Sequence, residues 1–169
     1  MQSDENPFLS DANIPQSNGT TDLMIAVKNG DLNEVKKLLA SGADPNVLDE
    51  WNSSALLQAC YHIDTFRSMC DIIRELLDRG ANQSVRDRYG RSPLSLVSSS
   101  GKSIIVSKML DMGADPNVQD EDGETALMCA SKYLYTEIIN ELLKRGADPE
   151  IKDNKGRTAK MFEESDIEN

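Results

Sequence analysis

Histidine, tryptophan and cysteine are scarce in this chain of 169 residues. The sequence has one histidine, one tryptophan and three cysteines, and aromatic residues make up 5% of it. The single histidine, His62, and the absence of a C-x-x-C pair leave too few ligands for a zinc site, so we expect no metal. An odd number of cysteines fits a secreted disulfide framework poorly. Cys60, Cys70 and Cys129 are therefore expected to be small apolar core residues.

Positive charge is also in deficit. The chain has 18 Lys and Arg against 29 Asp and Glu, which gives a net charge of -11. This charge repels phosphate backbones and anionic lipid surfaces, so we expect neither nucleic-acid nor membrane binding, and basic partners are favoured. No run of eighteen apolar residues exists, and the segment MQSDENPFLS at the start lacks the features of a signal peptide. We expect an intracellular location, in the cytoplasm with the nucleus as a second site.

The residue combinations on which catalysis depends are missing as well. The sequence contains no evident nucleophile beside a base, and no phosphate-binding glycine loop of the G-x-G-x-x-G or G-x-x-x-x-G-K-[ST] type. The prediction is a protein that is not an enzyme and that needs no cofactor.

What the chain does have is an internal repeat with two landmarks. The first landmark is a Gly-Ala segment found at Gly42-Ala43-Asp44-Pro45-Asn46, Gly80-Ala81-Asn82, Gly113-Ala114-Asp115-Pro116-Asn117 and Gly146-Ala147-Asp148-Pro149. Its glycines are 38, 33 and 33 residues apart. The second landmark keeps step with it at Gly19-Thr20-Thr21, Asn52-Ser53-Ser54, Gly90-Arg91-Ser92, Gly123-Glu124-Thr125 and Gly156-Arg157-Thr158. Two landmarks in phase indicate a repeat protein.

Between the landmarks the chain alternates two helical patterns. A first helix is predicted after each N-capping Ser or Thr, at Thr21, Ser54, Ser92, Thr125 and Thr158. A second helix is predicted from a wider apolar stripe, such as Val35, Leu38 and Leu39. The glycine of the Gly-Ala segment ends the second helix in a left-handed conformation. A loop of about ten residues follows, and an aspartate at its tip is expected to bond its own backbone, at Asp49, Asp87, Asp120 and Asp153.

This pattern resembles the ankyrin repeat, whose unit reads roughly D-x-x-G-x-T-P-L-H-x-A-A-x-x-G-x-x-x-x-V-x-x-L-L-x-x-G-A-D-x-N, over residues 19 to about 162. The resemblance implies an all-α repeat solenoid with β-hairpin loops, a stack of four units plus a C-terminal half unit. We assign the ankyrin domain to 19–161, with units at 19–49, 50–87, 88–120 and 121–153 and a half unit from 154. A disordered acidic arm at 1–18 and an acidic tail at 162–169 are predicted to flank it.

Three departures from the family pattern are informative. No unit keeps the histidine of the Thr-Pro-Leu-His motif, which suggests modest stability. The second unit carries five extra residues within 61–68, interpreted either as a loop extension whose aromatics pack locally or as a contact for a partner. The half unit has a single helix, so we expect part of Ile138, Ile139 and Leu142 to be exposed.

The resemblance also implies a function. The family uses the concave face of its stack for protein contacts, so we expect a monomeric adaptor or regulator that binds a partner protein. The predicted contact residues occupy the variable positions of the unit and are Glu50, Trp51, Ser53, Tyr61, His62, Arg88, Tyr89, Arg91, Glu121, Asp122, Glu124, Lys132 and Tyr133. Trp, Tyr and Arg are the residue types that dominate interface hot spots. The competing interpretation is that Trp51 and Tyr89 flatten against neighbouring loops.

Two further hypotheses concern the ends of the chain. Residues 1–18 and 162–169 contain acids and no base, which suits a dedicated chaperone or inhibitor of a basic client protein. Within the arm, Asn6-Pro7-Phe8 resembles the tripeptide ligand of EH domains, in which an Asx-Pro turn presents the phenyl ring. The alternative for this tripeptide is a simple turn whose phenylalanine packs on the first repeat or on nothing.

Overall fold

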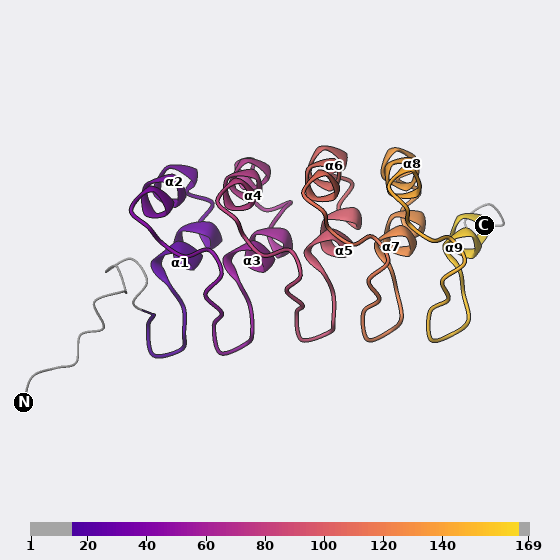
Figure 1. Ribbon diagram of the computed structural model, residues 1–169, viewed down its shortest axis with the longest axis horizontal. Helices are drawn as coiled ribbons and strands as arrows, with labels where there is room; N and C mark the ends of the chain where they lie inside the picture. The colour runs from indigo at the N-terminus through magenta and orange to yellow at the C-terminus, as the bar shows by residue number, and fades with distance from the viewer. Residues whose placement is uncertain (1–14, 166–169) are drawn as a thin grey trace, which may run out of the picture. The chain divides into compact units, whose positions relative to one another are not determined.

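The computed structural model describes residues 15–165, and that part of the chain contains nine helices and no β-strand (Figure 1). The helices are α1 (Asp22–Lys28), α2 (Leu32–Ala40), α3 (Ala55–Tyr61), α4 (Met69–Asp78), α5 (Pro93–Ser98), α6 (Ser103–Asp111), α7 (Ala126–Lys132), α8 (Thr136–Lys144) and α9 (Ala159–Ser165). They belong to two compact units that meet in sequence between Asn82 and Gln83. The first unit contains α1 to α4, and the second contains α5 to α9.

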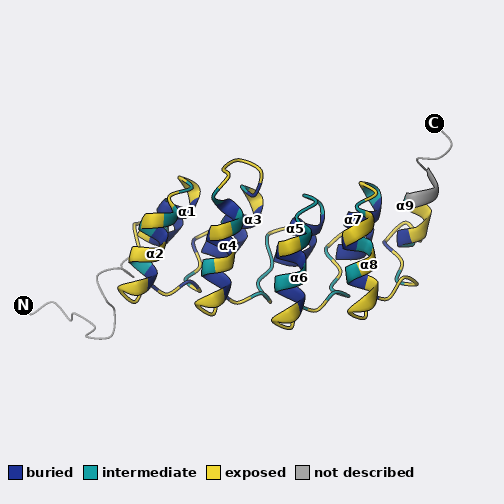
Figure 2. Cartoon of the chain, turned by 90° about the horizontal axis from the view of Figure 1, so that it is seen from above, coloured by how far each residue is buried: buried dark blue, intermediate teal, exposed yellow. Residues whose placement is uncertain are grey.

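Each unit is built from helix pairs in two layers. In the first unit α1 packs on α2 and α3 on α4, while α1 contacts α3 in one layer and α2 contacts α4 in the other. In the second unit α5, α7 and α9 form one layer, and α6 packs on α8 in the other. Buried residues face the interior of each pair, as the dark blue ribbon in Figure 2 shows. The all-helical repeat architecture predicted from the two landmarks is therefore observed over the described residues.

The predicted N-caps begin the first helices of the pairs. Thr21, Ser54, Ser92 and Thr125 all have extended backbone, and each side chain accepts a hydrogen bond from the backbone N–H three residues later. This bond satisfies one of the amide groups that the first turn of a helix leaves without a partner. These four side chains are buried, so the caps lie within the core of the repeat rather than at its surface.

The predicted left-handed glycines end the second helices. Gly42, Gly80, Gly113 and Gly146 have φ between 81° and 91°. The alanine after each glycine donates its N–H to the carbonyl five residues earlier, for example Ala147 to Leu142 at 2.9 Å. This is the Schellman arrangement, which satisfies the last carbonyls of a helix.

The loops between the helix pairs are not strands in the described residues, so the β-hairpin part of the prediction is not confirmed. Each tip is closed by two backbone hydrogen bonds only, which is too short a ladder for a strand pair. In the first such loop the N–H of Asp49 donates to the carbonyl of Ser53, and the N–H of Asn52 donates to the carbonyl of Asp49, both at 3.0 Å.

The first loop of the chain begins earlier than the predicted start at residue 19. The N–H of Gln16 donates to the carbonyl of Thr20 at 2.9 Å, and that of Gly19 donates to Gln16 at 2.8 Å. These are the bonds that Asp49 makes with Ser53 and Asn52 in the next loop. Residues 16–20 therefore form a complete loop tip, whereas residues 1–14 of the predicted arm lie outside the described residues.

The prediction that Ile138, Ile139 and Leu142 of α8 are partly exposed is wrong for two of the three residues. Ile138 and Leu142 are buried, because α7 and α6 cover their side of α8. Ile139 is half-buried, and the most exposed apolar residue of this helix is Leu143, at 41%. Leu143 occupies the position of Leu110 in the preceding helix pair, and Leu110 is 7% exposed.

Candidate functional site

The tip of each loop is organised by one aspartate. Oδ1 of Asp49 accepts hydrogen bonds from the N–H groups of Trp51 and Ser53, at 3.0 and 2.9 Å. Asp87, Asp120 and Asp153 make the same two bonds to the residues two and four positions later. The aspartates are therefore turn residues that bond their own backbone, as predicted. Because the backbone is held by the carboxylate, the side chains beside it are left to face solvent.

Adjacent tips are joined to each other within each unit. The N–H of Glu50 donates to the carbonyl of Asn18 at 3.1 Å, and the N–H of Glu121 donates to the carbonyl of Tyr89 at 3.0 Å. In the second unit the next tip adds two bonds from Asn154, whose N–H reaches the carbonyl of Asp122 and whose side chain reaches that of Glu121. The backbone at the predicted contact positions Glu50, Glu121 and Asp122 is therefore fixed by its neighbours.

In the first unit, Trp51 and His62 line a hollow of about 530 Å³. Trp51 is 57% exposed, and His62 is half-buried at the C-terminal end of α3. Lys28 and Asn29, which occupy the predicted variable positions of the first repeat, also line it, and the lining is completed by residues that were not predicted as contacts, namely Gln16, Asn18, Thr20, Met24, Ile25, Asp49 and Gln58. The phase of Gly19 with Asn52 was the signal that residues 16–20 form a loop of the same kind. Of the other predicted residues in this unit, Tyr61 and Glu50 are exposed and Ser53 is half-buried, and none of the three lines this hollow.

In the second unit, Arg91, Glu124, Lys132 and Tyr133 line a smaller hollow of about 180 Å³. The structure thus brings together four predicted residues from the tip of one loop, the tip of the next and the end of α7. Ser99, at a predicted variable position of the third repeat, lines it as well, and the remaining lining residues were not predicted as contacts and are Ser95, Leu96, Asp120 and Cys129. Arg88, Tyr89, Glu121 and Asp122 are exposed at the loop tips and do not line the hollow.

The charges around this second hollow are arranged in pairs. Nε of Arg91 donates to Oδ2 of Asp87 at 2.8 Å, and the guanidinium of Arg91 lies 5.0 Å from the centre of the Tyr89 ring. Arg88 stacks on the same ring at 4.7 Å. Two guanidinium groups therefore lie over the Tyr89 ring, and these contacts favour a fixed orientation of an exposed aromatic side chain.

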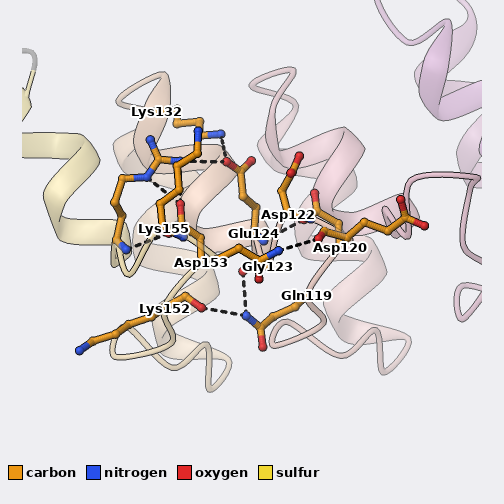
Figure 3. A network of polar contacts seen from close by, with 12 residues as sticks. Gln119, Asp120, Asp122, Gly123, Glu124, Lys132, Lys152, Asp153 and Lys155 are labelled. Carbon is orange, nitrogen blue, oxygen red and sulfur yellow. Dashed lines mark hydrogen bonds and ion pairs between the residues drawn. The ribbon is translucent and has the colours of Figure 1, made fainter.

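Glu124 is the centre of a second group of charges, drawn in Figure 3. Its carboxylate forms an ion pair with Lys132 and a longer one with Arg157, at 3.7 Å. Nε2 of Gln119 donates to the carbonyls of both Gly123 and Lys152, at 2.8 and 3.0 Å. Together these contacts tie the loop tip before α7 to the loop tip before α9.

Two of the three thiols, those of Cys60 and Cys129, are unsuited to nucleophilic chemistry. Burial raises the pKa of Cys60 well above its usual value, and burial together with the nearby carboxylate of Glu124 raises the pKa of Cys129 to about 12. Both thiols are protonated at neutral pH, and only the thiolate is reactive. Cys60 is a core residue as predicted, whereas Cys70 and Cys129 are half-buried.

Residues 15–165 contain neither a cluster of possible metal ligands nor a helix that could span a membrane. No three His, Cys, Asp or Glu side chains of that part are placed to hold a metal ion. None of its helices combines the length and the apolar character needed to cross a bilayer. The tripeptide Asn6-Pro7-Phe8 lies outside the described residues.

The five-residue insertion packs against the preceding helix pair. Oγ of Ser68 donates to the carbonyl of Gly30 at 2.7 Å. The ring of Phe66 covers the same glycine so closely that a β-carbon there would lie 2.5 Å from Cγ of the ring. Ile63 is buried. These contacts support the interpretation of a loop extension that packs locally, although Tyr61 at its start stays 44% exposed.

Comparison with known proteins agrees with this architecture. The family model for ankyrin repeats (3 copies) matches residues 23–120 and 62–153. The chain belongs to the ankyrin-repeat family. It is 34% identical to ankyrin repeat and SAM domain-containing protein 6 of Rattus norvegicus over 95 residues, 56% of this chain and 10% of that protein. It is 32% identical to serine/threonine-protein kinase 12 of Arabidopsis thaliana over 77 residues, 46% of this chain and 16% of the kinase.

These relatives are similar to the chain over short parts of their own length. The aligned segments are a sixth or less of either protein, so the activity named for the kinase is not transferred to this chain. Ankyrin repeats generally mediate protein–protein interaction and are typically not catalytic. The class of protein defined here is therefore an ankyrin-repeat interaction module.

Proposed function

We propose that this chain is a small intracellular adaptor or regulator that binds a partner protein through the loop tips and the C-terminal ends of the first helices. The observation that carries the proposal is the placement of exposed aromatic side chains. Trp51, Tyr61, Tyr89 and Tyr133 are between 44% and 58% exposed, and all four lie at the predicted contact positions. Large amphipathic side chains on a fixed backbone lose little entropy on binding.

Pre-ordering of the surface supports the same proposal. Trp51 and Tyr89 stand beside aspartates that hold the backbone of their loops, and Tyr89 is flanked by two guanidinium groups. A surface that is rigid before the partner arrives binds with a smaller entropic cost. We propose in addition that the chain acts as a monomer, without a cofactor, and without contacts to nucleic acid or membrane.

The test is capture of partners from a native lysate on immobilised protein, at low and at high salt, with mass spectrometry of the retained proteins. Wild type is compared with the Trp51→Ala/Tyr89→Ala double variant. Ile104→Ala serves as the matched control, because Ile104 is an exposed apolar residue of α6 outside the predicted set. A discrete protein retained at high salt by wild type and Ile104→Ala, and lost by the double variant, is the expected result. Equal retention by all three variants would contradict the proposal.

A second candidate function has a different signature. The net charge of -11 suits a chaperone or inhibitor of a basic client, held mainly by long-range attraction. Salt screens such attraction over about 10 Å at 0.1 M ionic strength. Retention of basic proteins only at low salt, equally by wild type and the double variant, would favour this second function over the first.

A further inference from the structure

The second carboxylate oxygen of three tip aspartates accepts a hydrogen bond from a side chain of the same loop or of the helix that follows it. Oδ2 of Asp49 accepts from Nε2 of Gln58 at 3.1 Å. Oδ2 of Asp87 accepts from Nε of Arg91 at 2.8 Å, and Oδ2 of Asp153 accepts from Nε of Arg157 at 2.7 Å. In the loops of Asp87 and Asp153 the donor stands four residues after the aspartate.

Asp120 differs from these three aspartates. Its Oδ1 accepts from the N–H groups of Asp122 and Glu124, at 3.0 and 2.8 Å, as in the other loops. The residue four positions later is Glu124, an acid where Asp87 and Asp153 have an arginine. Within residues 15–165, Oδ2 of Asp120 therefore receives no hydrogen bond and the carboxylate makes no ion pair.

Asp120 faces the hollow of about 180 Å³ in the second unit. The other charged residues that line it already have partners of opposite charge, since Arg91 pairs with Asp87 and Lys132 pairs with Glu124. Asp120 is thus the charged residue of this lining that lacks a counter-ion in the described part of the chain. Partial burial, with the carboxylates of Glu124 and Asp122 close by, raises the pKa of Asp120 above its usual value. A cation bound in the hollow would lower this pKa again.

The size and the walls of the hollow narrow the choice of ligand. Pockets for cofactors and drug-sized molecules measure roughly 300–1,000 Å³, so this hollow fits one side chain rather than a small-molecule ligand. Tyr133 forms part of the wall, is 58% exposed, and stacks on Tyr135 with ring centres 5.7 Å apart. An aromatic face next to a carboxylate is a favourable environment for a guanidinium group, which is planar and donates along its edge.

We propose that the hollow between Asp120 and Tyr133 is the receptor for a single arginine side chain of the partner protein, whose guanidinium donates to Oδ2 of Asp120. This inference rests on the proposed function, because it assigns one contact within the same binding surface. It names a chemical requirement that the family resemblance does not supply. The partner presents an arginine to the second unit, and the carboxylate of Asp120 is the negative group that receives it.

The probe for this site is N-acetyl-L-argininamide, with the neutral N-acetyl-L-citrullinamide as its isosteric control. Each is titrated into isotope-labelled full-length chain while the backbone amide resonances are followed by NMR. Wild type is expected to show saturable shifts at residues lining the hollow with the arginine probe and none with citrulline. Equal shifts with both probes, or no saturable shift with either, would overturn the proposal.

Asp120→Asn and Glu121→Gln separate a receptor from a general charge effect. Asparagine keeps a carbonyl oxygen for the two backbone N–H bonds, so the loop is expected to stay folded, which the same spectra report. Glu121 is exposed, carries the same charge and does not line the hollow. Loss of the pair is expected to weaken the arginine probe by about tenfold in Asp120→Asn and hardly at all in Glu121→Gln. Equal weakening in both variants would mean that net charge alone attracts the probe.

The same variants distinguish failure of this inference from failure of the proposed function. If the captured partner is lost with the Trp51→Ala/Tyr89→Ala variant but kept with Asp120→Asn, the binding surface stands and the arginine receptor is wrong. If the probe binds in the predicted way while the partner is kept by the double variant, the receptor stands and the placement of the wider surface is wrong.

Discussion

The ring of Tyr135 lies over Gly101, where a β-carbon would come within 3.0 Å of Cε1 and Cζ of the ring. Gly101 joins α5 to α6 with a φ of 71°, and Tyr135 precedes α8 of the next repeat. The contact resembles that of Phe66 with Gly30 in the first unit, so an aromatic side chain covers a glycine at the same place in both units.

Gly101→Ala is expected to lower the free energy of unfolding by about 1–2 kcal/mol, because a side chain at positive φ is strained and this one also meets Tyr135. Leu134 occupies the equivalent position 33 residues later with a φ of 54° and is 48% exposed. Leu134→Gly is expected to raise the free energy of unfolding by up to about 1 kcal/mol, since the same strain is removed. Urea denaturation measures both. Two changes of the same sign would contradict the explanation.

Asn117 bridges two neighbouring loops. Its Nδ2 donates to the carbonyl of Gly146 at 3.0 Å, and its Oδ1 accepts from the N–H of Asp148 at 2.7 Å. Asn117→Ala is expected to cost about 1–3 kcal/mol, because two backbone groups lose their partner. Asn140→Ala is the control, since Asn140 is exposed on α8, and it is expected to leave the urea midpoint unchanged or slightly higher. A midpoint for Asn117→Ala equal to that of the control would show that water replaces the bridge without loss.

The insertion within residues 61–68 gives a third prediction. Ser68→Ala removes the hydrogen bond to Gly30, and Phe66→Ala removes the ring that covers it. Each is expected to cost about 1 kcal/mol and to speed proteolytic cleavage within residues 62–68. Thr65→Ala, at an exposed residue of the same loop, is expected to change neither. If cleavage of this loop is equally fast in wild type and in both variants, the local packing does not stabilise it.

Asp120 and Asp153 hold equivalent positions, and their pKa values move in opposite directions from the ordinary value of 3.8. Burial raises the pKa of Asp120. Burial also acts to raise the pKa of Asp153, but hydrogen bonds from Arg157 and Lys155 outweigh it, and the pKa is lowered. At neutral pH, Asp153→Asn is therefore expected to cost about 1–2 kcal/mol, whereas Asp120→Asn is expected to be neutral or stabilising.

The differences in unfolding free energy between wild type and each of these two variants should also depend on pH. The stability that ionised Asp153 contributes is lost as the pH falls through its lowered folded-state pKa, below 3.8. In that range the unfolding free energies of wild type and Asp153→Asn are therefore expected to approach each other. The penalty for ionised Asp120 is absent below 3.8 and develops as the pH rises through its raised folded-state pKa. Urea unfolding across an acid-to-neutral series checks both. Parallel profiles for the two variants would contradict the assignment.

Much of the fold could be predicted because its signals are local in sequence. A cap such as Thr125, a helix-ending glycine such as Gly146 and a turn aspartate such as Asp153 each act within a few residues, and all three appear as predicted. Phase between the landmarks then placed the helices. The expected strands are not confirmed in residues 15–165, where each loop tip closes with two backbone hydrogen bonds, a number that residue spacing alone does not reveal.

The parts that escaped prediction depend on contacts across repeats. The bridge made by Asn117 joins residues 29 and 31 positions apart, and Phe66 covers a glycine in the preceding helix pair. The unpaired oxygen of Asp120 is visible in the sequence only in retrospect, as a glutamate where two other loops have arginine. The exposure of Leu143 was missed because the sequence has the same residue type at the equivalent position, Leu110, which is buried.

In each loop tip, Oδ1 of the aspartate accepts hydrogen bonds from two backbone N–H groups and so fixes the turn. These bonds do not depend on the side chains that follow the aspartate, because every residue type except proline has a backbone N–H. The dipeptides at the tips, such as Glu50-Trp51, Arg88-Tyr89 and Glu121-Asp122, are therefore interchangeable as far as the turn is concerned. Under the proposed function, a tip dipeptide exchanged between two loops is therefore expected to carry its partner contacts with it, while the turn that holds it keeps the same backbone hydrogen bonds.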